Sequence, residues 1–288
     1  MNPVSASSLL HFTKTMGALK GILKEGFRYS YCYEEYNNAI PFNNTHKEYA
    51  KFFIGEKGTK RGVAIPMISF CDIPLLRAQE HSKYYGKYII GIDKNYVEIL
   101  YQRLNPVLYV LPSSRMDLML CDISISKDNF DNNGAYNYRQ SVNHLIAYSK
   151  RYRGFDIYRN RETCFYDERE WRIVLEEGNG DYEAPWIWNI EFNSKKEYKK
   201  YIDPYNEKLY SSKGAYLKFI KFHEKSDENY FCNFITQIVV KKEKEIPELI
   251  KYILNTKNKL FGYEGISDNA RKILVSKITS FERIEKDF

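Results

Sequence analysis

Cysteines are few in this 288-residue sequence, and their positions exclude two kinds of small protein. No two of the five form a CxxC pair, and their number is odd. This spacing argues against a disulfide framework and against a zinc ribbon, so we expect a protein of the reducing cytoplasm. The cysteines are Cys32, Cys71, Cys121, Cys164 and Cys232.

Long hydrophobic runs are also missing. No run approaches the roughly 20 apolar residues that cross a bilayer. Residues 1–10 lack the charged and then apolar layout of a secretory signal. We therefore expect no membrane span. A hydrophobic fraction of 43% and an aromatic fraction of 16% nevertheless exclude disorder for most of the length.

Several motifs that define enzyme classes do not occur. The sequence has no GxxxxGK[ST] loop, no GxGxxG, no HExxH and no GxSxG. Its five histidines do not cluster, and no metal site is expected. These absences remove common nucleotide-binding loops, zinc proteases and serine hydrolases, but they leave catalysis open.

The net charge of +7, with a sequence pI near 8.9, does not by itself identify a partner. Acidic residues alternate with basic ones, as in KKEKE at residues 241–245, and no basic stripe is evident. A richness in Lys, Asn, Ile and Tyr is typical of an AT-rich genome. Nucleic acid therefore stays one option for a target rather than a conclusion.

Hydrophobic periodicity predicts a mixed α/β chain, of class α+β, in one domain over residues 1–288. Residues 122–139 interrupt the pattern and are interpreted as an insertion or loop. Residues 29–62 are expected to form an extended loop with one short helix at 47–53. Residues 5–26 are predicted to form a short strand followed by a helix, with Gly26 at the C-cap position. Further strands are predicted at residues 63–70, 88–92, 106–111, 170–176, 186–192, 217–222 and 235–240, and 186–192 could pair with 170–176. Further helices are predicted at residues 75–84, 93–104, 141–152, 247–254 and 268–277.

The first polar constellation is His11 and Thr13, at the end of a predicted strand. Residues two apart on a strand share a face, so both side chains could address the ribose or amide of a nucleotide. The alternative is a histidine that caps the following helix or satisfies a buried carbonyl.

The second constellation is Ser69 and Cys71, on either side of Phe70. Phe70 would pack in the core while the two small polar groups line a cleft. The alternative is an ordinary strand end at which Asp72 opens a turn.

The third constellation is FYDEREWR at residues 165–172. In an extended segment Glu168 and Glu170 point to one side, where their repulsion would raise the pKa of at least one carboxyl. Arg169 and Arg172 are expected on the opposite face, paired with Asp167 or with a neighbouring strand. The alternative is a solvated, charged strand.

Taken in order, several segments resemble the AbiGi family of abortive phage resistance proteins. They are SSLLHFTK (7–14), GILKEGF (21–27), IPMISFCDIPL (65–75), His81 with YYGKYIIGI (84–92), NPVLY (105–109), FYDEREWR (165–172) and KITSFERIEKDF (277–288). The resemblance implies a role in abortive infection. Members are commonly labelled as the antitoxin half of a two-gene system, which implies a cognate toxin as partner.

A more distant resemblance is to ADP-ribosyltransferases, whose split sheet with flanking helices holds NAD in a cleft. It implies that His11 hydrogen-bonds the nicotinamide ribose and that Ser69 supports the nicotinamide pocket. Thr13, on the same face as His11, is expected to bind the cofactor as well. It also implies that Glu170 is catalytic, holding the ribose 2′-hydroxyl. Glu168 then orients the acceptor, and Tyr84 or Tyr85 stacks on the nicotinamide ring. Cys71 departs from the Ser-x-Ser pattern of that fold.

Three functions remain open from the sequence. The first is an enzyme that uses NAD as substrate to modify a protein or nucleic acid. The second is a non-catalytic antitoxin or sensor that binds a toxin or a phage protein through an exposed aromatic patch at residues 29–36 and 198–216. The third keeps the transferase-like site but binds a nucleotide as a signal, without turnover.

Overall fold

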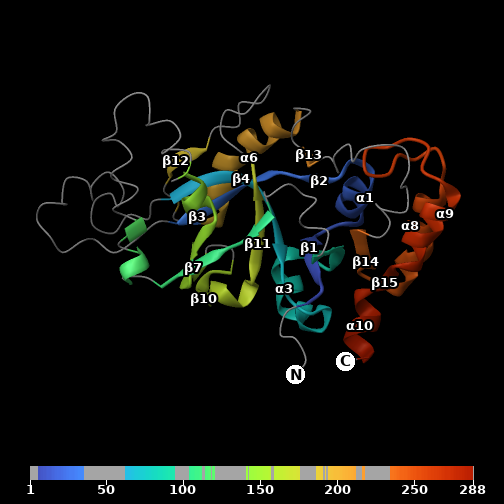
Figure 1. Cartoon of the computed structure of the whole chain (residues 1–288), viewed down its shortest axis with the longest axis horizontal. Coiled ribbons are helices and arrows are strands. Elements are labelled where there is room, and N and C mark those ends of the chain that lie inside the picture. Colours follow the sequence, from blue (N-terminus) through green and yellow to red (C-terminus); the bar gives the residue numbers. More distant parts are fainter. Residues whose placement is uncertain are drawn as a thin grey trace, which may run out of the picture.

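A computed structural model describes most of the chain, and helices flank one large sheet (Figure 1). The described residues are 6–35, 62–94, 104–111, 114–117, 119–120, 141, 143–156, 159–175, 186–190, 192, 194–211, 216–217 and 234–287. The mixed α+β class is confirmed. Within the described ranges, no helix is both long and apolar enough to span a bilayer. The predicted helix at 47–53 and the predicted insertion at 122–139 lie outside the described residues.

The sheet is built around β4 (Gly62–Cys71), a nearly continuous apolar run that is buried on both faces. The strand order is β15-β14-β5-β1-β4-β11-β6, with β3 and β12 also paired to β4. The bounds are β1 (Ser8–Thr13), β3 (Ser30–Glu35), β5 (Tyr88–Asp93), β6 (Leu104–Pro106), β11 (Glu170–Val174), β12 (Ile187–Ile190), β14 (Ile235–Val240) and β15 (Ile278–Ser280). The pairings are antiparallel except for β14 with β15, so the sheet is mixed.

One edge of β4 is shared by two strands that do not meet. β3 pairs with residues 62–67 of β4, whereas β1 pairs with it only where Leu10 lies opposite Cys71. Ser69 therefore has no strand partner on this edge, although Arg172 of β11 lies opposite it on the other edge. The sheet is split at Ser69, and the split positions the site described below.

The helix α1 (Met16–Glu25) follows β1 and begins and ends at residues that suit those positions. The Thr15 side chain accepts a hydrogen bond from the Ala18 amide, as an N-cap should. Gly26 ends the helix with a φ of 96°, a conformation that glycine adopts without strain. The sequence-based prediction of a strand, a helix and a glycine cap in this region is confirmed.

The remaining short elements surround the split edge and the far side of β11. They are β2 (Phe27–Arg28), η2 (Leu75–Arg77), α3 (Ala78–Tyr85), β7 (Leu108–Val110), β8 (Ser149–Arg151), β9 (Arg153–Asp156), β10 (Arg161–Cys164), η5 (Phe165–Glu168) and β13 (Tyr216–Leu217). β7 and β8 form a parallel pair, β9 and β10 an antiparallel hairpin.

The loop predicted for residues 29–62 is wrong at its start, because residues 30–35 form β3. The sequence-based prediction also missed α6 (Lys195–Ser211), the helix that packs against β3. This helix contains Pro204 and many charged residues. Tyr198 donates its hydroxyl hydrogen to the carbonyl of Tyr31, and the ring of Tyr205 packs edge-on against that of Tyr31. The two tyrosine-rich segments thus pack against each other in part, whereas Tyr201 stays 43% exposed. Residues 36 and 212–215 lie outside the described residues. The role of these segments as a partner surface stays a prediction.

Two further predictions need correction. The strand at residues 187–190 pairs with β4 rather than with β11. The helix predicted for 141–152 ends early, because residues 149–151 form β8 alongside β7. This second difference matters, because it turns Lys150 towards the sheet and into the site.

The chain ends in a helical layer over β14 and β15, comprising η7 (Glu243–Glu245), α8 (Ile246–Leu254), α9 (Asp268–Ser276) and α10 (Phe281–Asp287). Leu249 and Ile253 of α8 and Leu274 of α9 are fully buried in the main core. Figure 1 shows these helices together at the end of the sheet opposite to β7. The helices predicted at 247–254 and 268–277 are confirmed.

Candidate functional site

Three segments far apart in the sequence meet at Ser69. The ring nitrogen Nδ1 of His11 lies 2.9 Å from the Ser69 carbonyl oxygen. The Ser69 hydroxyl donates to Oε1 of Glu170 at 2.7 Å. The split of the sheet makes this possible, because the Ser69 carbonyl faces a histidine where another strand would otherwise stand.

His11 is a neutral imidazole in this setting. Burial lowers its pKa, and the hydrogen bond to Ser69 opposes that effect without reversing it. Because Nδ1 faces a carbonyl acceptor, we assign the ring hydrogen to Nδ1, which leaves Nε2 as an acceptor. The alternative that His11 satisfies a carbonyl is confirmed, and Thr15 rather than His11 caps α1. A role towards a ligand through Nε2 stays a prediction.

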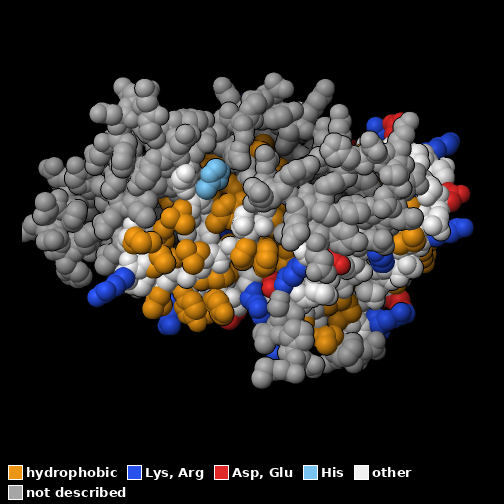
Figure 2. Space-filling view, viewed as in Figure 1, with side chains coloured by type: hydrophobic (Ala, Val, Ile, Leu, Met, Phe, Trp, Pro, Cys, Tyr) orange, Lys and Arg blue, Asp and Glu red, His pale blue; other side chains and the backbone are white. Residues whose placement is uncertain are grey.

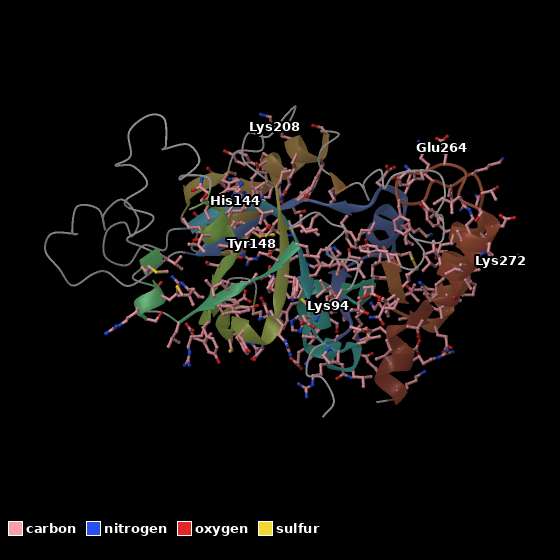
Figure 3. The ribbon with its side chains drawn as sticks, viewed as in Figure 1. Lys94, His144, Tyr148, Lys208, Glu264 and Lys272 are labelled. Carbon is pink, nitrogen blue, oxygen red and sulfur yellow. The ribbon has the colours of Figure 1, made fainter. Side chains whose placement is uncertain are left out.

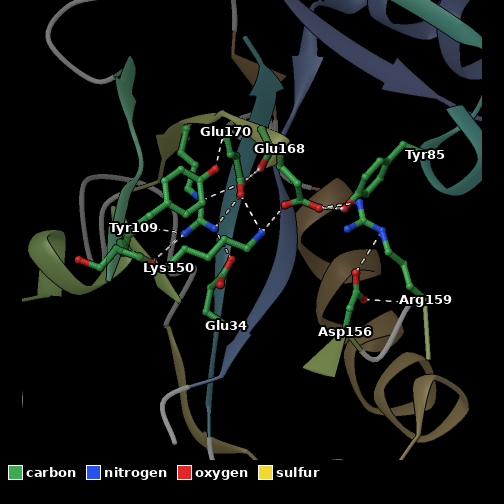
Figure 4. Close-up of polar contacts among 12 residues, drawn as sticks. Glu34, Tyr85, Tyr109, Lys150, Asp156, Arg159, Glu168 and Glu170 are labelled. Carbon is green, nitrogen blue, oxygen red and sulfur yellow. Dashed lines mark hydrogen bonds and ion pairs between the residues drawn. The ribbon is translucent and has the colours of Figure 1, made fainter. Parts of the chain in front are cut away.

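The Glu170 carboxylate is almost fully buried and accepts four hydrogen bonds (Figure 4). Its donors are the Ser69 hydroxyl at 2.7 Å, Arg172 Nε at 2.8 Å, Lys150 Nζ at 2.9 Å and Arg172 Nη2 at 3.0 Å. Burial alone would raise the pKa of Glu170, but Arg172 and Lys150 hold it well below its ordinary range. Glu170 therefore stays ionised throughout the physiological pH range.

Glu168 belongs to the same network although it precedes the strand. It accepts from Tyr85 at 2.9 Å, from Arg159 Nη2 at 2.7 Å and from Lys150 Nζ at 2.8 Å. Burial would raise its pKa, but Lys150 and Arg159 lower it. The expectation that repulsion raises the pKa of Glu168 or Glu170 is wrong, because the ammonium of Lys150 lies between the two carboxylates.

Arg172 corrects a second expectation. The sequence predicts its side chain on the face opposite to Glu170, paired with Asp167 or with a neighbouring strand, but residues 170 and 172 share a face of β11. Its fully buried guanidinium binds Glu170, Glu34 and the carbonyl oxygen of Ala147. Burial raises the pKa of Glu34, an effect that Arg172 only partly offsets.

Residues that the motifs did not single out complete the network. The sequence predicts a loop at Glu34 and a helix at Lys150, whereas the two residues lie in β3 and β8. Arg159 also pairs with Asp156, and the Tyr109 hydroxyl accepts from the Glu170 amide at 2.7 Å. The one available signal for Lys150 was its position between two tyrosines, in the alternating run YSKRY at residues 148–152, which is typical of a strand rather than a helix.

The network forms one side of a cavity of about 1060 Å³ at the split edge of the sheet. All seven residues to which the sequence assigns a role at NAD line this cavity: His11, Thr13, Ser69, Tyr84, Tyr85, Glu168 and Glu170. The structure thus brings them together, while their roles towards a ligand stay predictions. The guanidinium of Arg159 lies over the Tyr84 ring at 4.8 Å from its centroid, so part of that ring is already covered.

The carboxylates of the site are surrounded by cationic side chains. Among the residues that the structure describes, no three His, Cys, Asp or Glu side chains are arranged to hold a metal ion. Glu168 and Glu170 are instead neutralised by Lys and Arg. The site therefore offers fixed charges, a neutral imidazole and a hydroxyl that can rotate.

Comparison with known proteins identifies one family. Its profile matches residues 27–221, more than half of the chain, and its description reads "Putative abortive phage resistance protein AbiGi, antitoxin". No curated protein and no solved structure matches the chain. The matched range includes Ser69, Lys150, Glu168 and Glu170, whereas His11 precedes it.

Proposed function

Because the chain belongs to the AbiGi family, we propose that it acts in abortive phage infection by binding NAD at the split edge and transferring ADP-ribose to a macromolecular target. One observation carries the proposal. His11, Ser69 and Glu170 come from three separate strands and are joined by two hydrogen bonds on one side of a large cavity. All three can therefore touch one sugar, as the transfer requires.

The residues present suit such a substrate in size and in polarity. A cavity of about 1060 Å³ is at the upper end of the volumes usual for small-molecule sites, so it can take a dinucleotide. NAD would supply an ADP-ribosyl group whose bond to nicotinamide is weak enough to break. Bond breaking leaves the electron pair on nicotinamide, and a nucleophile of the target bonds to the sugar carbon and loses a proton to water.

Each of the three residues has a definite task in this scheme. Neutral His11 accepts a hydrogen bond from a ribose hydroxyl through Nε2. Rotation of the Ser69 hydroxyl frees one lone pair of Glu170 for a second ribose hydroxyl. The Glu170 carboxylate, which is ionised because of its lowered pKa, then stabilises the positive charge that develops on the sugar.

The lowered pKa values also limit the chemistry. Neither Glu168 nor Glu170 is a good proton acceptor near pH 7, since a general base works best when its pKa is close to the working pH. We therefore expect a target nucleophile that needs no deprotonation by the protein before it attacks.

The test is transfer of label from NAD. Wild-type protein and Glu170→Gln are incubated with adenylate-labelled NAD, lysates of uninfected and infected cells, and total nucleic acid. We expect label on a macromolecule with wild type and at least a hundredfold less with Glu170→Gln, as for loss of a charge-stabilising group. Glu264→Gln, an exposed change on the loop after α8, is the matched control (Figure 3).

The test stays decisive if Glu170→Gln unfolds. Ser69→Ala removes a hydroxyl and leaves the ion pairs of Glu170 with Arg172 and Lys150 in place. It should fold normally and transfer label at an altered rate. Neither transfer nor loss of NAD with folded wild type in any lysate would reject the transferase.

A second function, a non-catalytic antitoxin or sensor, is favoured by another observation. With four hydrogen bonds the acceptor capacity of Glu170 is full, so the network is also complete without a ligand. In that case Glu170→Gln would leave phage protection intact in a folded protein. Binding of NAD without transfer would instead indicate that a nucleotide acts as a signal.

An exposed apolar surface near β7 would suit a partner for that second function. Five large apolar side chains there are 40–51% exposed: Leu108, Leu111, Met116, Met119 and Tyr166. Tyr166 packs edge-on against Tyr109 at 5.4 Å between ring centroids, which joins the two segments. Figure 2 shows hydrophobic side chains gathered over β7 and β10 on this face. If the chain works by binding a toxin, Leu108→Glu with Leu111→Glu should abolish the complex and leave NAD chemistry unaffected.

A further inference from the structure

Lysine side chains from four elements line one end of the cavity. Lys14 follows β1, Lys87 precedes β5 and Lys241 follows β14, while Lys83 lies in the last turn of α3. None of them belongs to the network around Glu170. We call these residues the lysine end of the cavity.

The sheet register places three of these lysines side by side. Thr13 is opposite Tyr88, so the next residue outward, Lys14, is beside Lys87. Val239 is opposite Ile89, so Lys241 is beside Lys87 on the other side. Because neighbouring strands lie about 4.8 Å apart, the three backbone positions span about 10 Å.

Gly86 fixes the fourth lysine against this row. A Cβ atom at Gly86 would lie 2.2 Å from the Thr13 carbonyl oxygen and 2.6 Å from the Lys14 Cα. Only glycine permits so close an approach, and the φ of +106° also favours it. The C-terminal turn of α3, with Lys83, is therefore held against Lys14.

Two of these lysines pair with carboxylates that lie outside the wall of the cavity. Lys87 pairs with Glu285 at 2.6 Å and Lys83 pairs with Glu80, but neither carboxylate lines the cavity. Both carboxylates are solvent-exposed partners, and such pairs are weak enough for a stronger anion to compete. The carboxylates that do line the cavity, by contrast, are bound to Lys150, Arg159 and Arg172.

We propose that the lysine end binds the phosphate groups of a nucleotide whose ribose lies at His11, Ser69 and Glu170; the position of the ribose rests on the proposed function. Lys14 follows β1 three residues after His11, a distance of about 10 Å along an extended chain. Gly17, in the first turn of α1, also lines the cavity and leaves room for phosphate oxygens. Ammonium groups pair strongly with phosphate, so this end determines affinity for the ligand rather than reactivity.

The test compares ADP with adenosine by calorimetric titration. For Lys14→Gln with Lys241→Gln we expect ADP affinity to fall at least about tenfold, as for loss of one charge-assisted bond, and the weaker adenosine affinity to stay unchanged. Lys251→Gln with Lys272→Gln removes the same charge from exposed positions on α8 and α9, outside the cavity. Figure 3 labels Lys272. This control pair should change ADP affinity less than about twofold at 0.15 M salt.

Three results would overturn the inference. They are wild-type protein that does not bind ADP at millimolar concentration, an unchanged ADP affinity in Lys14→Gln with Lys241→Gln, and an equal loss in the control pair. Lys87→Gln serves as a second variant if the first does not fold.

Failure of the proposed function gives a different pattern. If ADP binding depends on Lys14 and Lys241 but NAD is never consumed, the phosphate site stands and the transferase does not. If Glu170→Gln abolishes transfer while Lys14→Gln with Lys241→Gln retains both ADP affinity and turnover, the transferase stands and the phosphate site does not.

Discussion

Arg172 and Arg271 are both fully buried, yet their surroundings are of opposite kinds. Arg172 binds the carboxylates of Glu170 and Glu34 beside the cavity. Arg271 of α9 donates only to backbone carbonyls in the described part of the chain, at Ile253 (2.6 Å), Asn255 (3.0 Å), Asn258 (2.8 Å) and Ile266 (3.2 Å).

Arg172 therefore belongs to the candidate site, whereas Arg271 stabilises the fold. Arg271 satisfies carbonyls at the C-terminal end of α8 and in the loop that follows, as cationic groups commonly do at helix ends. That loop in turn donates from Phe261 to the Leu23 carbonyl at the end of α1. Arg172 instead holds charges whose balance depends on other side chains and on pH. We infer that the burial of an arginine does not by itself indicate a functional site. The chemical nature of its hydrogen-bond acceptors is the better indicator.

The largest expected effect is that of Arg172→Met. The change leaves Glu170 and Glu34 buried with fewer cations, which should lower the free energy of unfolding by about 3–5 kcal/mol. Urea denaturation at pH 7 measures it. Adding Glu34→Gln should restore part of the loss, since it removes one orphaned carboxylate. A single variant as stable as wild type would contradict the account of the network.

Arg271→Met should have a smaller effect on the free energy of unfolding, about 1–3 kcal/mol. The freed carbonyls are neutral and lie at the end of α8 and in the loop that follows it, where water can replace the guanidinium. Hydrogen exchange should increase in residues 253–266, while ADP affinity stays unchanged. If this variant lost ligand affinity instead, the separation between site and support would fail.

The pH dependence of the free energy of unfolding should also distinguish the two arginines. The pKa values of Glu168 and Glu170 lie below the ordinary value of 4.5. Their ionised forms therefore stabilise the fold above about pH 4.5, and this contribution is lost as the pH falls through the pKa values of the folded protein. Each tenfold difference in proton affinity between the folded and unfolded chain contributes about 1.4 kcal/mol. Glu34 has a raised pKa and acts with the opposite sign, gaining stability as the pH falls from that value towards 4.5.

Unfolding measured at several pH values tests this linkage. Glu170→Gln should flatten the loss of stability below pH 4.5, whereas Arg271→Met should give a curve parallel to that of wild type. Parallel curves for both variants would show that the network carries no acid-linked stability.

The smallest expected effect is that of Tyr109→Phe. Its hydroxyl accepts from the Glu170 amide, so its loss should destabilise the fold by about 1 kcal/mol. Thermal unfolding with Tyr252→Phe as control, whose hydroxyl makes a longer contact of 3.4 Å with the Lys20 carbonyl, provides the measurement. An effect no larger than that of the control would mean that Tyr109 does not hold Glu170 in place.

The sequence predicted elements with strong periodicity and missed those formed by tertiary contact. The apolar run of β4 and the capped helix α1 could be read directly. The strand β3, polar and rich in tyrosine, is stabilised by α6, and α6 itself contains Pro204; neither shows a clear pattern alone.

The candidate site shows the same division. His11, Ser69 and Glu170 could be singled out because each is a polar residue in or beside a predicted strand and because their order resembles that of the motifs of ADP-ribosyltransferases. Lys150 was missed because its neutralising role depends on β8 lying near β11, which no local pattern shows. Without Lys150 the electrostatics of Glu168 and Glu170 were predicted with the wrong sign.

Phage protection by matched variants tests most directly whether the cavity is a functional site. Cells carrying the gene in its native neighbourhood would express wild type, Glu170→Gln or Arg271→Met at equal levels of folded protein, with plaque formation as the readout. We expect Glu170→Gln to lose protection and Arg271→Met to retain it. Full protection by folded Glu170→Gln would contradict the claim that the cavity is a functional site. The charges around Arg172 would then only stabilise the fold, as Arg271 does.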